Sequence, residues 1–379
     1  MELGHSFFMA RGAGLIRSLI QASIFVLFAF VTVPGARGEV TGIEMWQPER
    51  GGPRLLIPVI EGTSRANWIQ NYLRAFNASP DYRRLNGGRD LRLGSSSSSI
   101  EPTRPFHPSP SETPFVVLAN RPGHMQARDP FLRSVLGSLD SAGADPYVLP
   151  LGLDAALSER DLEQFHSLVV DRFPGMLAIG GGDIDPALYG AEVTGARDLV
   201  PARDRVEASL IRRYTRSERG MFYGICRGSQ LCAATLGFRL NQDLPTSQPE
   251  SRVAHSVSAE GARDAAHASE WHVIEVSEDS RFLRPAVGRA TINVNSRHHQ
   301  AVVEAPNPHA RVVARSLDGT VEAMEFVNGR GALFQFHPED MRTEDSARIL
   351  AAMVRSTRER AKEDLGSCLT SAVSNLMRE

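Results

Sequence analysis

The sequence is poor in cysteine and in lysine, and its charges nearly cancel. Of its 379 residues only Cys226, Cys232 and Cys368 are cysteines, too few for a disulfide framework. Among 42 basic residues only Lys362 is a lysine, and the net charge is −2 with no conspicuous basic run. This balance excludes a strong nucleic-acid footprint, so we expect no nucleic-acid partner.

The sequence also lacks an apolar run long enough for a typical transmembrane helix. The run from about Ala22 to Val33 falls short of the roughly 20 residues that such a helix needs. Arg11 and Arg17 precede this run, and the small-residue stretch Ala36–Gly38 follows it. The pattern predicts that residues 1–38 form a signal peptide, and that the protein is exported (periplasmic or secreted) without stable membrane insertion. An uncleaved N-terminal anchor is the alternative.

Residues 39–113 lack a clear domain pattern. Ala66–Phe76 fits an amphipathic helix, whereas Gly51–Pro53, Asn86–Gly88 and the serine- and proline-rich stretch from Gly94 indicate turns and a linker. We therefore predict a poorly structured N-terminal extension to which no function is assigned.

Apolar runs and helical patterns alternate from residue 114 onward, which predicts βαβ units and a parallel sheet. The expected strands are Phe115–Ala119, Tyr147–Leu149, Met176–Ile179, Trp271–Val276, Ala290–Val294, Arg311–Ala314, Val321–Phe326 and Ala332–Phe336. The expected helices lie near residues 129–141, 159–165, 203–216 and 342–365, and residues 366–379 form a C-terminal tail.

A strand-like run, Met221–Ile225, ends at Cys226 between Gly224 and Gly228. A residue at such a strand-to-helix turn is strained, and its side chain is pushed out of the sheet. The positive end of the following helix favours thiolate over thiol. We therefore predict that Cys226 is a nucleophile, whereas Cys232 is expected to be a small buried apolar residue.

The stretch Gln335–Glu339 ends the last expected strand. His337 and Glu339 lie two residues apart with Pro338 between them. This spacing lets the imidazole face a thiolate while the carboxylate holds its other nitrogen and fixes the tautomer. We predict a catalytic triad of Cys226, His337 and Glu339.

Four stretches together carry a family resemblance: Gly224–Gln230, Gly180–Gly190, Val294–Gln300 and Gln335–Glu339. They resemble class I glutamine amidotransferases, and within that superfamily the gamma-glutamyl-gamma-aminobutyrate hydrolase-like peptidases. The resemblance implies one α/β, flavodoxin-like domain over residues 114–365, with a central mostly parallel sheet, a nucleophile elbow and a β-rich second half. It also implies hydrolysis of gamma-glutamyl amides through a thioester.

The resemblance assigns an oxyanion hole to the backbone N–H groups of Gly181 and Arg227, with Gly180 beside them. Such donors stabilise a tetrahedral intermediate. Asp183 and Asp185 are expected to shape this loop through bonds from backbone groups rather than to contact substrate or metal.

Further residues are expected to bind substrate. Gln230 lies one helical turn after Cys226, so its amide suits the alpha-amino or alpha-carboxyl group of a glutamyl moiety. A core residue with its amide bonded to backbone is the alternative for Gln230. The resemblance places Asn295, Ser296 and His299 in the pocket wall.

The adjacent pair His298 and His299 raises the question of a metal. The chain offers no CxxC or HExxH motif to accompany them, so neither a metal nor another cofactor is expected. The expected partner is a small-molecule gamma-glutamyl substrate, and the sequence leaves open whether the protein forms a homodimer. Two rival functions are a glutaminase subunit that supplies ammonia to a synthase and a non-catalytic binding module of the same fold.

Overall fold

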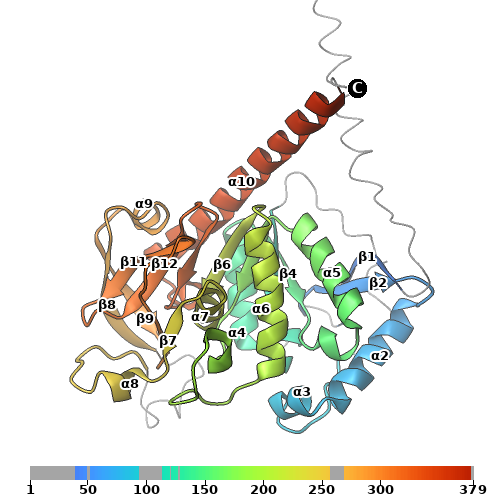
Figure 1. Ribbon diagram of the computed structural model, residues 1–379, viewed down its shortest axis with the longest axis horizontal. Coiled ribbons are helices and arrows are strands. Elements are labelled where there is room, and N and C mark those ends of the chain that lie inside the picture. Colours follow the sequence, from blue (N-terminus) through green and yellow to red (C-terminus); the bar gives the residue numbers. More distant parts are fainter. Residues whose placement is uncertain are drawn as a thin grey trace, which may run out of the picture.

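The computed structural model describes residues 39–48, 52–93, 113–119, 121–126, 129–256 and 269–376 (Figure 1). The predicted signal segment, residues 1–38, and most of the predicted linker lie outside the described residues. No helix within the described ranges is both long and apolar enough to cross a membrane.

A mixed, 11-stranded sheet organises the described chain, in the order β1-β2-β4-β3-β5-β6-β13-β12-β11-β8-β9. The strands from β2 to β13 in this order run parallel to one another, and antiparallel strands flank them on both sides. This arrangement confirms the predicted fold class, including the β-rich second half. The strands are β1 (Val40–Trp46), β2 (Leu55–Ile60), β3 (Pro114–Leu118), β4 (Asp145–Leu149), β5 (Gly175–Ala178), β6 (Met221–Ile225), β8 (Glu270–Val276), β9 (Thr291–Ser296), β11 (Ala310–Ser316), β12 (Val321–Phe326) and β13 (Gly331–Phe334).

Helices cover both faces of the parallel strands (Figure 1). One face carries α5 (Glu159–Arg172), α6 (Pro201–Arg216) and α7 (Arg227–Thr235), and the other carries α4 (Pro130–Ser141), α9 (Leu283–Val287) and α10 (Glu344–Leu376). The side chains of Asp129 and Ser158 accept backbone N–H bonds and cap the starts of α4 and α5. Two helices are longer than expected: α5 continues to Arg172, and α10 runs through most of the expected tail and projects from the body.

The N-terminal segment corrects one expectation. Residues 40–48 and 52–85, predicted to be poorly structured, form β1, β2, α2 (Arg65–Ala78) and α3 (Pro80–Leu85), and β2 pairs in parallel with β4 of the main sheet. Gly42 and Pro58 interrupt the two strand patterns. Gly42 lies in the edge strand β1, and Pro58 lies in β2, whose pairing with β4 is made at Leu55 and does not involve Pro58. The helix expected at residues 66–76 is confirmed as α2.

Aromatic side chains fasten α2 to the domain. Trp68, Tyr72 and Phe76 are buried, and the Trp68 and Tyr72 rings stack with centroids 5.3 Å apart. The Tyr72 hydroxyl donates to the carbonyl of Leu151 at 2.6 Å. The segment therefore belongs to the same packed core as the sheet.

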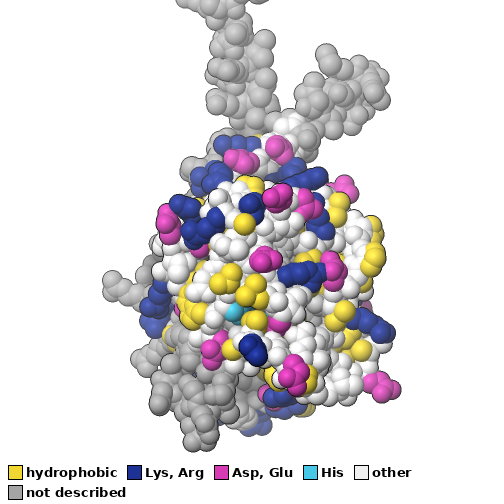
Figure 2. Space-filling view, turned by 90° about the vertical axis from the view of Figure 1, so that its left-hand side faces the viewer, with side chains coloured by type: hydrophobic (Ala, Val, Ile, Leu, Met, Phe, Trp, Pro, Cys, Tyr) yellow, Lys and Arg dark blue, Asp and Glu magenta, His cyan; other side chains and the backbone are white. Residues whose placement is uncertain are grey.

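Short elements complete the described chain. A separate two-stranded sheet joins β7 (Arg239–Asn241) to β10 (Ala301–Val303), and α8 (Leu244–Ser247) follows β7. Single 3₁₀ turns are η1 (Pro122–Met125), η2 (Leu153–Ala155), η3 (Pro186–Tyr189) and η5 (Pro338–Asp340). On the face that includes the β8–β9 edge, side chains of both charges are interspersed with apolar ones (Figure 2).

The Phe76→Ala variant tests whether the N-terminal segment belongs to the cooperative unit. Truncating this fully buried ring should lower the free energy of unfolding by about 3 kcal/mol. The exposed residue Leu317 supplies the control, since Leu317→Ala should change stability by less than about 0.5 kcal/mol. Denaturant titration followed by fluorescence measures both. Equal stability of the two variants would mean that α2 folds apart from the sheet.

Candidate active site

The turn between β6 and α7 holds Cys226 in a strained conformation. Its φ of 48° and ψ of −111° lie where non-glycine residues are uncommon. A Cβ at Gly224 would lie 2.8 Å from the backbone nitrogen of Ser229, and one at Gly228 would lie 2.1 Å from the carbonyl oxygen of Ala178. Both positions therefore require glycine, as a sharp strand-to-helix turn predicts.

His337 lies at the end of β13, the strand that pairs with β6. Its Nδ1 is 2.7 Å from Oε1 of Glu339, and both residues are buried. A Cβ at Gly180 would lie 2.8 Å from Cε1 of His337 and 3.5 Å from Cβ of Cys226, so these three residues meet at one point. The structure thus brings together the three residues predicted as a triad.

The charge state of His337 follows from its neighbours. Burial on its own would lower the pKa of the imidazole, but Glu339 and Cys226 outweigh this effect and raise the pKa to about 9. The carboxylate fixes the proton on Nδ1, which leaves Nε2 to exchange a proton at the thiol or substrate. The ring is therefore charged at neutral pH.

Neighbouring side chains form hydrogen bonds with the backbone of His337 and Glu339. The amide of Asn295 accepts a bond from the backbone N–H of His337 at 2.9 Å. The hydroxyls of Ser134 and Ser138 on α4 donate to the backbone carbonyl of Glu339. Asn295, expected in the pocket wall, therefore positions the backbone of His337.

A buried group of charges lies behind the elbow. The guanidinium of Arg227 pairs with Asp204 and Glu207 of α6, and Arg203 lies against the same carboxylates. The second carboxylate oxygen of Asp204 accepts the backbone N–H of Asp185 at 2.9 Å. The family resemblance gives Arg227 a role through its backbone alone, whereas in the structure its side chain also joins the elbow to the loop after β5.

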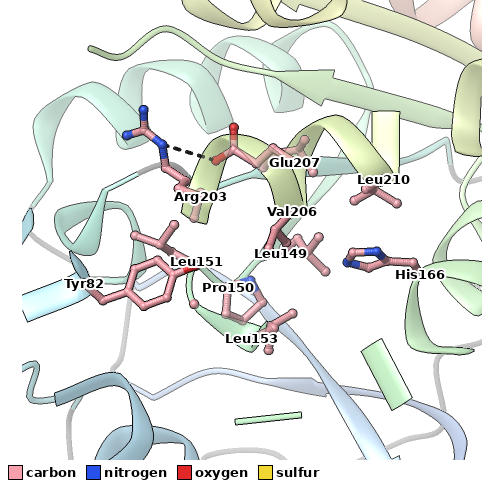
Figure 3. A pocket seen from close by; sticks show the side chains of 13 residues that line it. Tyr82, Leu149, Pro150, Leu151, Leu153, His166, Arg203, Val206, Glu207 and Leu210 are labelled. Carbon is pink, nitrogen blue, oxygen red and sulfur yellow. Dashed lines mark ion pairs between the residues drawn. The ribbon is translucent and has the colours of Figure 1, made fainter. Parts of the chain in front are cut away.

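Figure 3 shows the cavity beside this group of charges. Its volume is about 30 Å³, and its lining includes Tyr82, Leu151, Arg203 and Glu207, the last two joined by an ion pair. Cys226 does not line this cavity, which is therefore separate from the turn that holds the thiol.

The loop that carries Gly181 is held by acidic side chains, as predicted. Asp183 accepts the backbone N–H of Arg197 at 2.7 Å, and Asp185 accepts that of Ala187 at 3.0 Å. His299 bridges this loop to α8, because its Nε2 is 3.1 Å from Asp183 and its Nδ1 is 2.9 Å from Asp243.

The electrostatics of His299 fit this bridging position. The bond to Asp183 raises the pKa of His299 and outweighs burial, with Asp243 adding to the rise. His299 was expected to touch substrate. In the structure it instead joins the loop that carries Gly181 to Asp243 at the start of α8.

Gln230 and Ser296 are both tied to protein groups. The Gln230 side-chain nitrogen donates to the carbonyl of Gln300 at 3.0 Å and to Oε1 of Gln335 at 3.2 Å. This agrees with the alternative interpretation of Gln230. Ser296 is fully buried and donates to the carbonyl of His255 at 2.7 Å. It therefore holds the segment around His255 and does not form part of the pocket wall.

Two groups near the site escaped sequence reasoning. The ring of Phe131 on α4 lies edge-on to His337, with centroids 6.2 Å apart. His255, His272 and Glu322 gather with His298 behind the pocket wall. The sequence does not show which residues a single phenylalanine or histidine will contact, because these contacts depend on the fold.

Comparison with known proteins supports the motif-based resemblance. The model of the Peptidase C26 family matches residues 125–339. Protein NtpR of Enterococcus hirae is 31% identical over 208 residues, 54% of this chain and 79% of that protein. The gamma-glutamyl-gamma-aminobutyrate hydrolase PuuD of Escherichia coli is 32% identical over 194 residues, 50% of this chain and 72% of that protein.

Two further similarities accompany these. A putative glutamine amidotransferase-like protein, YvdE of Lactococcus lactis, is 35% identical over 163 residues, 42% of this chain and 63% of that protein. The crystal structure of a putative GMP synthase subunit from Thermoplasma acidophilum covers 67% of this chain and 98% of its own, with a TM-score of 0.45 and 14% identity. The predicted family resemblance is confirmed by the family match and the named relatives.

The titration of His337 tests the geometry without any substrate. In NMR titrations its ring should change protonation at about pH 9, and Glu339→Gln should move this midpoint to lower pH because a charge that raises the pKa is removed. The stabilisation linked to this shift is complete below the ordinary histidine pKa and is lost as the pH rises through about 9. A midpoint below 6.5 in the unaltered protein would contradict the arrangement.

Proposed function

The chain belongs to the Peptidase C26 family, and on this premise we propose that it is a cysteine hydrolase that cleaves gamma-glutamyl amide bonds. The observation that carries the proposal is the meeting of Cys226, Gly180 and the bonded pair His337–Glu339 at the carboxyl ends of adjacent strands. Ligand sites of open α/β sheets lie at such strand ends. The relative PuuD, named a gamma-glutamyl-gamma-aminobutyrate hydrolase, supports the substrate class.

The proposed mechanism uses each member of the triad in turn. The thiolate of Cys226 attacks the carbonyl carbon of the amide, and the imidazolium of His337 protonates the departing amine, which leaves a thioester. The neutral imidazole then takes a proton from water, which attacks the thioester and releases the glutamyl carboxylate and the thiol. Glu339 holds the ring in the orientation and tautomer that both steps need.

The oxyanion is assigned to backbone donors on either side of Cys226. The N–H of Arg227 follows the nucleophile at the start of α7, and the N–H of Gly181 comes from the loop after β5. Each such donor contributes about 3–4 kcal/mol in other enzymes. Asp204 supports this assignment because its carboxylate accepts bonds from the backbone N–H of Asp185 and the guanidinium of Arg227, which fixes the two segments relative to each other.

Substrate recognition centres on Gln230 and Gly180 in this proposal. The Oε1 atom of Gln230 accepts a bond from the alpha-amino group of the glutamyl moiety, since its nitrogen is occupied by Gln300 and Gln335. The absence of a side chain at Gly180 leaves room beside the thiol for the scissile amide.

A glutaminase subunit that supplies ammonia is the second candidate. The similarity to the putative glutamine amidotransferase-like protein of Lactococcus lactis favours it. The two candidates share the triad and differ in the leaving amine, so comparing glutamine with larger gamma-glutamyl amides separates them.

Export from the cytoplasm is also part of the proposal, and the basic and apolar pattern of residues 1–38 supports it. The expected result is that protein recovered from the extracytoplasmic fraction begins near Glu39, as N-terminal sequencing or intact mass would record. Recovery of all the protein from the cytosol with Met1 retained would contradict export.

The first test of the activity compares the cysteines. Cys226→Ala should abolish hydrolysis of a panel of gamma-glutamyl amides with different amines, because no nucleophile remains. Cys232→Ala should keep most of the activity, because Cys232 is fully buried in α7 and burial raises its pKa strongly. Cleavage of alpha-linked peptides alone, or full activity in Cys226→Ala, would overturn the proposal.

The second test uses two neighbouring glycines. In Gly180→Ala the new methyl group would displace the His337 ring, and kcat/KM should fall by roughly 100-fold. Gly182→Ala is the matched control, because its Cβ would have no neighbour within 4 Å among the described residues and the activity should be kept. Equal activity of the two variants would show that Gly180 does not border the reacting groups.

A further inference from the structure

A second group of histidines lies behind the pocket wall, where β9, β12 and the segment before residue 257 meet. His255, His298 and Glu322 are buried and present donor atoms that all lie within 4.8 Å of one another. Nδ1 of His255, Nε2 of His298 and Oε2 of Glu322 are buried and have no hydrogen-bond partner among the described residues. Unpartnered buried polar atoms are costly, and two imidazole nitrogens that converge on one buried carboxylate indicate a group that satisfies them.

The distances distinguish a metal from direct hydrogen bonds. Oε1 of Glu322 lies 3.4 Å from Nδ1 of His255 and 3.6 Å from Nε2 of His298. Both distances exceed the usual 2.7–3.2 Å of an N–H···O bond. They match the edge of about 3.4 Å between ligands of a tetrahedral ion whose bonds are near 2.1 Å.

The far nitrogen of each imidazole is held as metal-binding histidines require. Nε2 of His255 is 3.0 Å from the carboxylate of Asp318, and Nδ1 of His298 is 2.9 Å from the carbonyl of Gln300. Since both partners are acceptors, these nitrogens carry the protons, and in the neutral rings the lone pairs of the other two nitrogens face Glu322. A carboxylate or carbonyl behind a ligating histidine is the common arrangement at metal sites.

The carboxylate of Glu322 is oriented in the same way. Nε2 of His272 donates to its Oε1 at 3.0 Å, and Nδ1 of His272 faces the carbonyl of Ala254 at 3.2 Å. Asp318 in turn accepts bonds from Ser251 and Ser316, both at 2.6 Å. The donors are thus fixed by a surrounding layer of bonds, and Oε1 of Glu322 is the carboxylate atom that faces both imidazole nitrogens.

We propose that His255, His298 and Glu322 bind a first-row divalent metal ion, with Zn²⁺ as the fitting probe. Two imidazoles and a carboxylate suit Zn²⁺. The ion would pin the segment around His255 to β9 and β12. Neither CxxC nor HExxH marks this site in the sequence, because its ligands come from three separate stretches.

The position of this site links it to the elbow without making it catalytic. The carbonyl of Gln300 accepts bonds from both His298 and Gln230, and the backbone N–H of Gln335 donates to the carbonyl of Glu322. The ion therefore fixes the segment around Gln300, to which the side chain of Gln230 is bonded. The inference does not depend on the reaction assigned to Cys226.

The test uses tag-free protein that carries Cys226→Ala, because a thiol beside His337 could itself capture zinc. After dialysis against Zn²⁺ and then metal-free buffer, elemental analysis should find about one equivalent per chain. Removing it with a chelator should lower the melting temperature by about 5 °C or more. Co²⁺ in place of zinc should give the visible bands of a tetrahedral ion.

Variants locate the ion. His298→Gln and Glu322→Gln should lose the bound metal, Asp318→Asn should weaken affinity by roughly 10–100-fold, and His166→Gln, a buried histidine outside the cluster, should keep it. Less than about 0.1 equivalent in the Cys226→Ala protein, with no change in melting temperature upon chelation, would overturn the proposal. Full retention of metal in folded His298→Gln would overturn it too, and if that variant does not fold, the stoichiometry and Co²⁺ spectrum of the parent protein decide.

Discussion

The close approach of α7 to β5 and β6 is the constraint on which the site depends. Gly224 and Gly228 have no room for a Cβ, and Cys226 between them is held at a φ of 48°. Such a conformation costs on the order of 1–3 kcal/mol and persists only where the surroundings enforce it. Here the ion pairs of Arg227 and the parallel pairing of β6 with β13 enforce it. The same pairing brings His337 beside the thiol.

Much of this arrangement could be predicted from the sequence because its signals are local. The elbow, the strand that ends before His337 and the spacing of His337 to Glu339 are each contained in a few consecutive residues. The N-terminal strands were missed because Gly42 and Pro58 interrupt short patterns, and only the fold shows that Gly42 lies in an edge strand and that Pro58 does not pair with β4.

The roles of several polar residues could not be predicted, because they depend on contacts between distant stretches. Asn295 supports the backbone of His337, Ser296 holds the His255 segment, and His299 clamps Asp183 to Asp243. A sequence motif marks these positions as special without showing which group each one faces. These three side chains therefore hold neighbouring segments of the protein in place.

The central claim is that Cys226 forms a covalent thioester with the glutamyl half of the substrate. The most direct measurement is mass spectrometry of protein quenched with acid during turnover of a gamma-glutamyl amide, followed by peptide mapping. The account predicts one added glutamyl group on the peptide that contains Cys226, sensitive to hydroxylamine and absent from Cys226→Ala. A glutamyl group on any other residue, or the same adduct in Cys226→Ala, would contradict the account.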